Sequence, residues 1–237
     1  MKIIKLPDEW ETLPGSPELA EGTVHLWLAS LKQPTAYLQS LQRLLSPDEV
    51  QKAERFYFEK DKNAYIAGRG MLRKLLAAFL NTAPEQITFR YNPYGKPMLA
   101  NPANIDFNLS HSHELAFYAV SRGSVIGVDI EHIRPVNEFW EVARSYFSKN
   151  EIAMLETVAE ARQLEAFYNC WTRKEAYIKA KGEGLSMPLH QFDVTLIPGE
   201  PARLLQTRGD EGEARRWHLE SFTPQAGYVA AVAHILI

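Results

Sequence analysis

Two segments of the chain repeat one pattern, and this repetition limits the fold more than any other feature. Residues 107–120 and residues 217–232 each consist of a strand pattern, a polar corner and a second strand rich in alanine. Helical patterns precede the strands in each case. Repetition of this kind indicates duplication of one α+β unit. We therefore predict an α+β fold of two pseudo-symmetric α/β halves, residues 1–122 and 123–237, with a ligand site at their interface.

The expected elements follow from hydrophobic periodicity and from turn and capping signals. Ser46-Pro-Asp-Glu49 is a capping box with proline at the first helical position, and Ser148-Lys-Asn-Glu151 repeats the box. The first box starts a helix that we expect to run through residues 56–58, and a turn is expected at 92–97. The other predicted helices cover 62–80, 138–146, 149–157 and 160–180; the predicted strands cover 23–29, 87–91, 106–109, 115–121, 125–131, 192–197, 216–222 and 228–235.

Composition and charge exclude several classes of protein. The 237 residues carry a net charge of −3, so no overall field favours nucleic acid or an anionic membrane as a partner. The N-terminus lacks the apolar region of a signal peptide, and no apolar run is long enough to span a bilayer. The single cysteine, Cys170, excludes an internal disulfide and fits a cytoplasmic location. Its helical context predicts a small core residue rather than a nucleophile.

Asp129 and Glu131 lie two residues apart in Gly127-Val-Asp-Ile-Glu131. Side chains alternate along a strand, so both carboxylates project from the same face. Val128 and Ile130 then point into a core. Gly127 permits the close approach of another backbone. Two adjacent carboxylates repel each other unless a positive charge lies between them, although many strand ends carry two solvated acids.

A third acid interrupts an apolar helical stripe. Leu164, Phe167, Trp171, Glu175 and Ile178 follow one another at spacings of 3, 4, 4 and 3 residues, so they share one helix face. A charged carboxylate on such a face must be paired or coordinated. One alternative is an ion pair of Glu175 with Lys179, four residues later. Together with Asp129 and Glu131, however, three carboxylates suit Mg²⁺ shared with a substrate phosphate.

The remaining polar motifs leave several readings open. His111 and His113 flank Ser112 at a strand corner, where they could bind a transition metal, serve as ordinary loop histidines, or bind phosphate through Ser110 and His111. Gly182 is expected to cap the helix that carries Glu175. The helices of the first half are basic, which we interpret mostly as a solvated face, part of which could grip a phosphate. These basic residues are Lys52, Arg55, Lys60, Lys62, Arg69, Arg73 and Lys74.

These motifs together resemble the Sfp-type, double-length class of 4'-phosphopantetheinyl transferases. The resemblance covers residues 46–192 and consists of several pieces in family order. The pieces are Tyr94-Gly-Lys-Pro97, Phe107-Asn-Leu-Ser-His-Ser112, Gly127-Val-Asp-Ile-Glu131, Phe147-Ser148, and Trp171-Thr-Arg-Lys-Glu-Ala-Tyr-Ile-Lys179 followed by Gly182-Glu-Gly-Leu-Ser186. It implies the family fold of two similar halves with the site between them.

The resemblance also implies an activity and a set of site residues. The substrates would be coenzyme A and a serine of an apo acyl or peptidyl carrier protein, and 3',5'-ADP would be released. Asp129, Glu131 and Glu175 would hold Mg²⁺, or Mn²⁺ in its place, and Asp129, Glu175 and Lys179 would form the catalytic set. The residues expected to contact coenzyme A are Lys52, Arg55, Lys96, Ser110, His111, Lys174 and Lys179. Glu49 departs from the pattern, because some relatives carry a lysine there.

The resemblance leaves some questions open. The general base is either Glu175 itself or a water activated near it, and the sequence does not name the carrier. Docking of the carrier is expected around Phe147 and the helix containing Met154 and Leu155. A chain that carries both halves of the site is expected to act as a monomer. The alternatives are a non-catalytic module that binds coenzyme A or a carrier, a Mg²⁺-dependent pyrophosphate hydrolase, and a purely structural protein.

Overall fold

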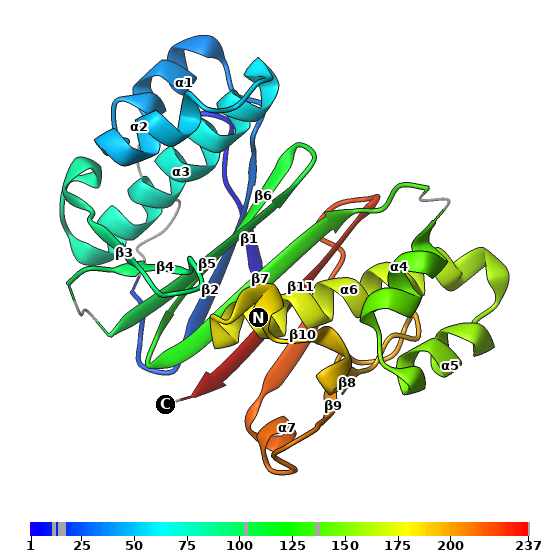
Figure 1. The fold of residues 1–237 in the computed structure, drawn as a ribbon. Coiled ribbons are helices and arrows are strands. Elements are labelled where there is room, and N and C mark those ends of the chain that lie inside the picture. Colours follow the sequence, from blue (N-terminus) through cyan, green and yellow to red (C-terminus); the bar gives the residue numbers. More distant parts are fainter. Residues whose placement is uncertain (11–12, 14–17, 102–103, 136–137, 237) are drawn as a thin grey trace.

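The computed structural model describes residues 1–10, 13, 18–101, 104–135 and 138–236, and confirms the α+β class (Figure 1). Two main sheets have the strand orders β1-β2-β6-β5 and β10-β11-β7. The first contains β1 (Ile3–Lys5), β2 (Val24–Ser30), β5 (Ile105–Ser112) and β6 (Leu115–Arg122), and the second β7 (Ser124–His132), β10 (His218–Phe222) and β11 (Tyr228–Leu236). Two short ribbons pair β3 (Phe89–Tyr91) with β4 (Pro97–Leu99), and β8 (Phe192–Val194) with β9 (Leu204–Thr207).

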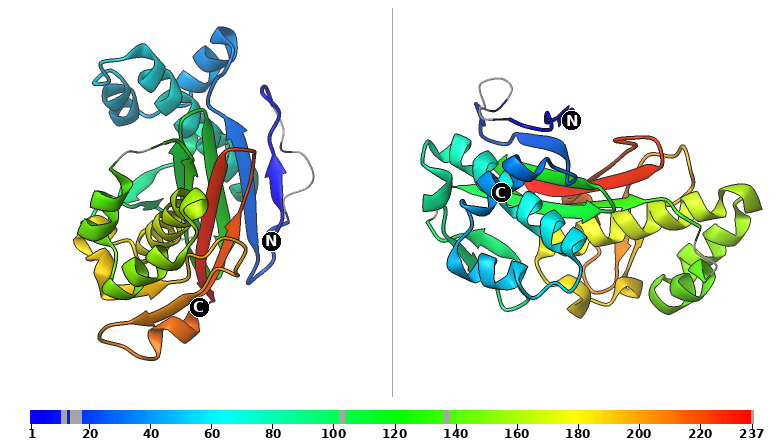
Figure 2. Two further views of the ribbon diagram at one scale, coloured as in Figure 1. Left: turned by 90° about the vertical axis from the view of Figure 1, so that its right-hand side faces the viewer. Right: turned by 90° about the horizontal axis from the view of Figure 1, so that it is seen from above.

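The helices form a separate layer on each sheet. Those of the first sheet are α1 (Thr35–Gln42), α2 (Pro47–Ala53) and α3 (Glu59–Leu80), and those of the second part are α4 (Phe139–Tyr146), α5 (Lys149–Thr157), α6 (Glu160–Lys181) and the single turn α7 (Glu213–Arg216). Each layer shares a hydrophobic core with its own sheet. A third core joins the two sheets and contains side chains of β2, β6, β7 and β11. The long helix α6 lies across β7 and β11 (Figure 2).

The same topology occurs in both parts of the chain. In one sheet β2 pairs with β6 and β6 with β5; in the other β7 pairs with β11 and β11 with β10, all antiparallel. Helices α3 and α6 both have 22 residues. Both predicted capping boxes are present, at Ser46 and Ser148. The repeated topology supports the division at residues 122 and 123, which stays a prediction.

The expectation that the basic residues of the first helices are solvated is wrong for Arg69 and Arg73. Both side chains are buried against Glu49, whose two carboxylate oxygens accept from their Nε atoms at 2.7 Å. Glu49 is the last residue of the first capping box, and it also accepts from the backbone N–H of Ser46. Since a buried charge must be paired, this carboxylate draws both guanidinium groups into the interior.

Several element boundaries differ from the expectation. The helix that starts at Pro47 ends at Ala53 rather than continuing to residue 58, because Phe58 adopts an extended conformation as the N-cap of α3. Helix α3 therefore begins at Glu59, three residues earlier than predicted, with Glu59 and Asp61 in its first turn, where acids are favourable. The sequence patterns did not predict β1, α1, β4, β9 and α7. Cys170 lies fully buried, as predicted.

The edge strands β5 and β7 lie side by side and are joined by side chains rather than by a backbone ladder. Every second residue of β5 is polar and reaches toward β7. Backbone N–H groups of β7 donate to these side chains: Ile126 to Asp106 Oδ2 (2.9 Å), Val128 to Asn108 Oδ1 (2.8 Å) and His132 to Ser112 Oγ (3.1 Å). The side chains thus satisfy donors that an edge strand would otherwise leave unpaired.

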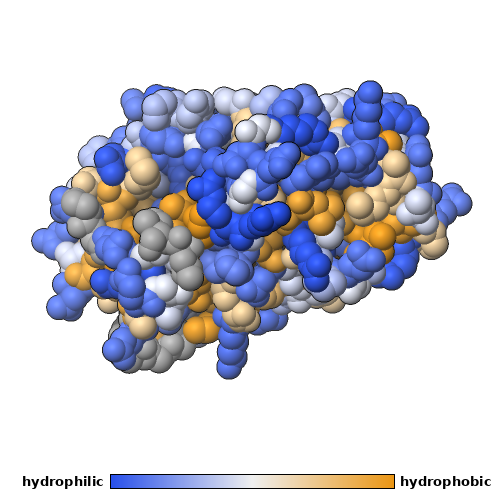
Figure 3. Space-filling model, turned by 90° about the horizontal axis from the view of Figure 1, so that it is seen from below, coloured by the Kyte–Doolittle hydropathy of each residue, from blue (hydrophilic) through white to orange (hydrophobic). Residues whose placement is uncertain are grey.

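Within the described residues, no helix is long and apolar enough to cross a membrane. Figure 3 shows the face seen from below, where apolar patches are interrupted by polar side chains.

We expect Gly127→Ala to lower the free energy of unfolding by about 2–3 kcal/mol. A Cβ at Gly127 would lie 2.2 Å from both the carbonyl oxygen of Ala176 and the backbone nitrogen of Ala180, so the strand and α6 would have to separate. Gly68→Ala is the matched control, because its Cβ would meet Leu31 at 3.6 Å, an ordinary contact. Urea unfolding measures both variants, and equal losses would contradict this explanation.

Candidate active site at the junction of the two sheets

The two acids of β7 project from the face predicted by strand alternation. Val128 and Ile130 are fully buried in the core between the sheets. On the opposite face, Asp129 Oδ1 accepts a hydrogen bond from Ser110 Oγ at 2.8 Å. Glu131 Oε2 likewise accepts from Ser112 Oγ at 2.7 Å. The polar side chains of β5 therefore orient both carboxylates.

Helix α6 adds Glu175 and Lys179 to this site. Its backbone closely approaches β7 at Gly127, which has no side chain to prevent the approach. Lys179 Nζ lies 2.5 Å from Asp129 Oδ1 and 3.0 Å from Ser110 Oγ. The ion pair of Lys179 is therefore formed with Asp129 and not with Glu175, so the predicted alternative of a Glu175–Lys179 pair is wrong.

The carboxylates of this cluster are incompletely neutralised. Burial raises the pKa of Glu175 to about 7, and the nearby charges of Asp129 and Glu131 add to the increase, against the opposing effect of Lys179. Burial and the charge of Asp129 also raise the pKa of Glu131. Asp129 Oδ2 is buried and has no hydrogen-bond partner. An unpartnered carboxylate oxygen beside two other acids fits a bound cation.

The site is not a preformed metal cage in this arrangement. Within the described residues, no three His, Cys, Asp or Glu side chains converge at metal-binding separation. Lys179 instead supplies the positive charge at Asp129. Binding of a divalent cation by Asp129, Glu131 and Glu175 would therefore require their side chains to turn toward a common point.

One cavity adjoins the carboxylate cluster, and a second lies beyond the turn between β5 and β6. The first, of about 510 Å³, is bounded by Glu131 and Arg134 and by an apolar wall. That wall contains Val142, Tyr146, Phe167 and Trp171. The other, of about 650 Å³, belongs to the first half and includes Lys60, Tyr65 and His111. The cavity of the first half thus has charged groups of both signs, Lys32, Lys60, Asp61 and Glu114, while the other has an apolar wall opposite Glu131 and Arg134.

Ser110 and His111 have different surroundings although they are neighbours. Ser110 is buried beneath Asp129 and Lys179, whereas His111 is exposed and lines the cavity of the first half. Desolvation, followed by the charge of Lys179, lowers the pKa of His111. His111 therefore lies at a cavity where an anion could bind. Ser110 lies instead beside the carboxylate of Asp129.

The structure does not bring Lys96 to an open anion site. Its Nζ lies 3.3 Å from Asp106 Oδ2, 3.1 Å from the carbonyl oxygen of Ile126 and 3.3 Å from that of Ala180. These partners belong to β5, β7 and the end of α6. Lys96 therefore ties the β3–β4 turn to the junction of the two sheets. Gly182 caps α6 as predicted, in the left-handed conformation.

The two basic residues predicted on α2 are both exposed. Lys52 Nζ lies over the ring of Tyr65, 5.4 Å from its centroid, at the edge of the cavity that Tyr65 lines. Arg55 instead donates to Gln51 at 3.2 Å, and it is not among the residues that line either cavity. Lys60, one of the basic residues expected in part to grip a phosphate, lines this cavity, and so does Tyr65, which was not predicted. In the sequence both residues belong to an ordinary helical pattern, which does not indicate that they line a cavity.

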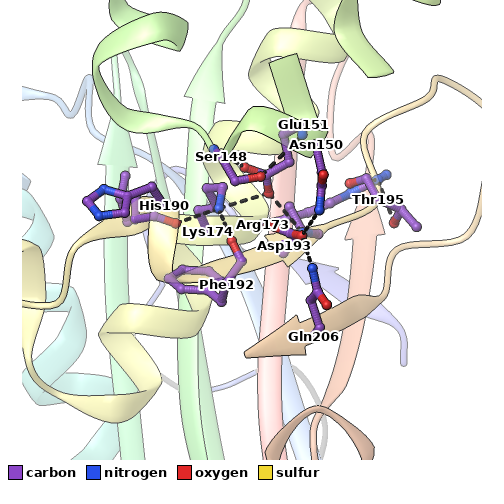
Figure 4. Close-up of polar contacts among 12 residues, drawn as sticks. Ser148, Asn150, Glu151, Arg173, Lys174, His190, Phe192, Asp193, Thr195 and Gln206 are labelled. Carbon is purple, nitrogen blue, oxygen red and sulfur yellow. Dashed lines mark hydrogen bonds and ion pairs between the residues drawn. The ribbon is translucent and has the colours of Figure 1, made fainter. Parts of the chain in front are cut away.

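Lys174 also lies away from the site. Its fully buried ammonium group donates to the carbonyl oxygens of Leu189 and Phe192 and pairs with Glu151 at 2.8 Å (Figure 4). Lys174 precedes Glu175, but adjacent helical residues point about 100° apart, which explains the different environments. Glu151 is the last residue of the second capping box and occupies the position equivalent to Glu49.

Docking of the carrier around Phe147 and the helix with Met154 and Leu155 stays a prediction, but two of these side chains do not reach the surface. Phe147 and Leu155 are buried in the core of the second half, so neither can meet a partner. Met154 is only partly buried. Helix α5 packs against α6, and Leu155 belongs to the hydrophobic core that the two helices share.

Comparison with known proteins places this site in a family. Residues 125–233 match the 4'-phosphopantetheinyl transferase superfamily, and residues 27–122 match the N-terminal region of 4'-phosphopantetheinyl transferase. The 4'-phosphopantetheinyl transferase HetI of Nostoc sp. is 38% identical over 231 residues, which are 96% of this chain and 94% of that relative. The chain belongs to the 4'-phosphopantetheinyl transferase superfamily. This membership confirms the resemblance found in the sequence.

More distant relatives carry the same family name. The 4'-phosphopantetheinyl transferase Sfp of Bacillus subtilis is 34% identical over 152 residues, covering 64% of this chain and 66% of the relative. Among solved structures, the holo-[acyl-carrier-protein] synthase of Thermotoga maritima matches 48% of this chain and 64% of its own, with 21% identity and a TM-score of 0.38. Because the chain matches the family models and HetI over nearly its whole length, it is a 4'-phosphopantetheinyl transferase, which moves 4'-phosphopantetheine from coenzyme A to a carrier protein. A non-catalytic binding module is not favoured.

We expect Lys174→Met to lower the free energy of unfolding by about 3–5 kcal/mol, because it leaves the buried carboxylate of Glu151 without its cation. Arg162→Met is the matched control, since the pair of Arg162 with Glu165 is exposed and should contribute less than about 1 kcal/mol. Denaturant unfolding measures both. A loss for Lys174→Met as small as the control's would show that the buried pair is dispensable.

Glu175→Gln should stabilise the metal-free protein at pH 8, where the carboxyl group with a pKa near 7 is ionised. Removal of one of three neighbouring negative charges should raise the free energy of unfolding by about 1 kcal/mol, after allowance for partial exposure. This corresponds to a rise of about 2–4 °C in Tm. Because protonation neutralises Glu175 at lower pH, the gain should shrink as the pH falls from 8 toward 5. Thermal unfolding in EDTA tests this; a lower Tm at pH 8 would contradict it.

Proposed function

We propose that the cluster of Asp129, Glu131, Glu175 and Lys179 performs the phosphopantetheinyl transfer, with Mg²⁺ held by the three carboxylates. The observation that carries this proposal is the state of Asp129. One of its oxygens is held by Ser110 and Lys179, and the other is buried without a partner beside two further acids. A buried acceptor left in this state is costly unless a ligand completes it.

The donor set suits a hard divalent cation. Carboxylate oxygens are the ligands that Mg²⁺ prefers, and Mn²⁺ also accepts them. When bound, the cation would supply positive charge to the oxygens of the diphosphate of coenzyme A. Burial, with the charges of the neighbouring acids added to it, raises the pKa of Glu131 and of Glu175, and a bound cation would offset both effects.

The two cavities match the two ends of coenzyme A. The cavity lined by Tyr65 and His111 offers the ammonium groups of Lys32 and Lys60 and an aromatic ring to the phosphorylated nucleotide, and it also contains the carboxylates of Asp61 and Glu114. Lys52 at its edge adds a further cation. The apolar wall that includes Phe167 and Trp171 suits the uncharged pantetheine arm. The diphosphate would then lie between the cavities, beside the acids.

The transfer is an in-line displacement at phosphorus. The carrier serine Oγ attacks the phosphorus atom that bears the pantetheine arm. The bond from that phosphorus to the bridging oxygen breaks, and 3',5'-ADP leaves with the bridging oxygen. Lys179 is placed to balance the charge that develops on the departing phosphate. Glu175 is the candidate acceptor of the serine proton, because it is a carboxylate of the same cluster and a general base must lie within reach of the attacking hydroxyl.

The structure assigns other work to some of the residues expected at the nucleotide. Lys96 and Lys174 are engaged by protein oxygens, and we assign them to positioning of the β3–β4 turn and of α6. Arg55 lines neither cavity, so we assign it no contact with the nucleotide. Ser110 orients Asp129 and Lys179, and His111 remains the candidate phosphate contact.

Further properties belong to the same proposal. The acceptors are apo acyl or peptidyl carrier proteins, and we expect more than one kind to be accepted. Both cavities lie in one chain, which supports action as a monomer. The buried single thiol of Cys170 supports a cytoplasmic location. A pyrophosphate hydrolase remains a second candidate, because the same acids could activate water instead of a serine.

The test is the intact mass of an apo carrier protein after incubation with the enzyme, coenzyme A and Mg²⁺. We expect a gain of one phosphopantetheine that requires the carrier serine and is lost with EDTA. Asp129→Asn should reduce the rate at least about 1,000-fold, and the exposed Glu156→Gln should leave it unchanged. Cleavage of coenzyme A without any gain by acyl or peptidyl carriers would favour the hydrolase, and near-normal transfer by Asp129→Asn would refute the metal assignment.

A further inference from the structure

His113 adopts a backbone conformation that is uncommon for residues other than glycine. It lies in the turn between β5 and β6 with φ +52°, in the left-handed region that favours glycine. The surrounding structure must hold a histidine in this conformation. Its position in a turn beside Ser112, which orients Glu131, places it next to the proposed catalytic cluster.

Ring contacts fix the side chain of His113 across the junction of the two sheets. Its imidazole stacks on that of His132, with ring centroids 4.9 Å apart and an interplanar angle of 24°. His132 in turn contacts the ring of Tyr228, with centroids 4.8 Å apart. A side chain from the first half is thereby held against β7 and β11 of the second. The stack leaves the nitrogen-bearing edge of the His113 ring available, since no hydrogen bond of the described residues engages it.

His113 is also the point at which the two cavities meet. It lines the cavity of the first half together with His111, and it lines the other cavity together with Glu131. Of the described residues along the two walls, it is the one common to both. A substrate that occupies both cavities must pass this side chain.

We propose that His113 contacts the diphosphate of coenzyme A where the substrate crosses from one cavity to the other, and thereby positions the reacting phosphorus. The inference rests on the proposed function, because it takes coenzyme A to occupy both cavities. The diphosphate lies between the nucleotide and the pantetheine arm, so it passes the junction. An imidazole N–H can donate to a phosphate oxygen, and the stack on His132 restricts the ring to that orientation.

The experiment compares two ligands that differ in whether they cross the junction. Coenzyme A crosses it, whereas 3',5'-ADP ends at its 5'-phosphate and lacks the second phosphoryl group and the arm. We expect His113→Asn to raise the Kd of coenzyme A at least tenfold and that of 3',5'-ADP less than threefold, measured by calorimetry with Mg²⁺. Transfer to an apo carrier should show a matching loss in kcat/KM for coenzyme A.

Two controls separate a lost contact from a disturbed fold. Asparagine tolerates the left-handed conformation, and His113→Gly relieves it altogether, so both variants should unfold within about 3 °C of the parent. Equal selectivity defects in both variants would show that the imidazole, rather than the backbone, is responsible. His190→Asn changes an exposed histidine outside both cavities and should leave both Kd values unchanged.

Two results would overturn the proposal. Unchanged binding of coenzyme A by folded His113 variants would show that no contact exists. Equal weakening of both ligands would place His113 in the nucleotide site instead of at the junction. Failure of the proposed function gives a different result: the parent protein binds coenzyme A but transfers nothing to any carrier. In that case the Kd values of coenzyme A and of 3',5'-ADP still decide the role of His113.

Discussion

The hydrogen bonds between β5 and β7 are the constraint on which the rest of the structure depends. Each strand is the edge of a different sheet, and an edge normally leaves backbone groups unpaired. The carboxylate, amide and hydroxyl oxygens of β5 accept from the N–H groups of β7 and so hold the edges together. The same row of side chains includes Ser110 and Ser112, which orient Asp129 and Glu131. One interaction therefore joins the sheets and arranges the site.

Carboxylates serve two opposite purposes in this molecule. Glu49 and Glu151 end the two capping boxes, and each is buried against cations of the long helix of its own half. Those charges are fully paired and stabilise the packing of helices. Asp129, Glu131 and Glu175 lie together around the ammonium group of Lys179, which pairs with Asp129, so three acids are not balanced by this one cation. This difference in pairing separates structural acids from those available to a ligand, although all five are wholly or partly buried.

Much of the site could be predicted because its spacing is local. Strand alternation places Asp129 and Glu131 on one face, and the interruption of an apolar helical stripe identifies Glu175. The roles of Lys96 and Lys174 could not be predicted in this way. A lysine's direction and partners depend on segments distant in the chain, such as Ala180 for Lys96 and Leu189 for Lys174. For the same reason the sequence did not single out Lys60 from the other basic residues or indicate Tyr65, since only the tertiary structure makes them line a cavity with His111.

By itself, the sequence determined the two capping boxes, the strand pattern around Asp129, the glycine that lets α6 approach β7, and the repeated order of elements. These features depend on neighbouring residues and on the periods of helix and strand, so they can be read along the chain. Only the tertiary structure decided that Lys179 pairs with Asp129 instead of Glu175, that Arg69 and Arg73 turn inward to Glu49, and that His113 stands between two cavities. Each of these results depends on which distant segments pack together, because the burial and pairing of a charge are set by its neighbours in space.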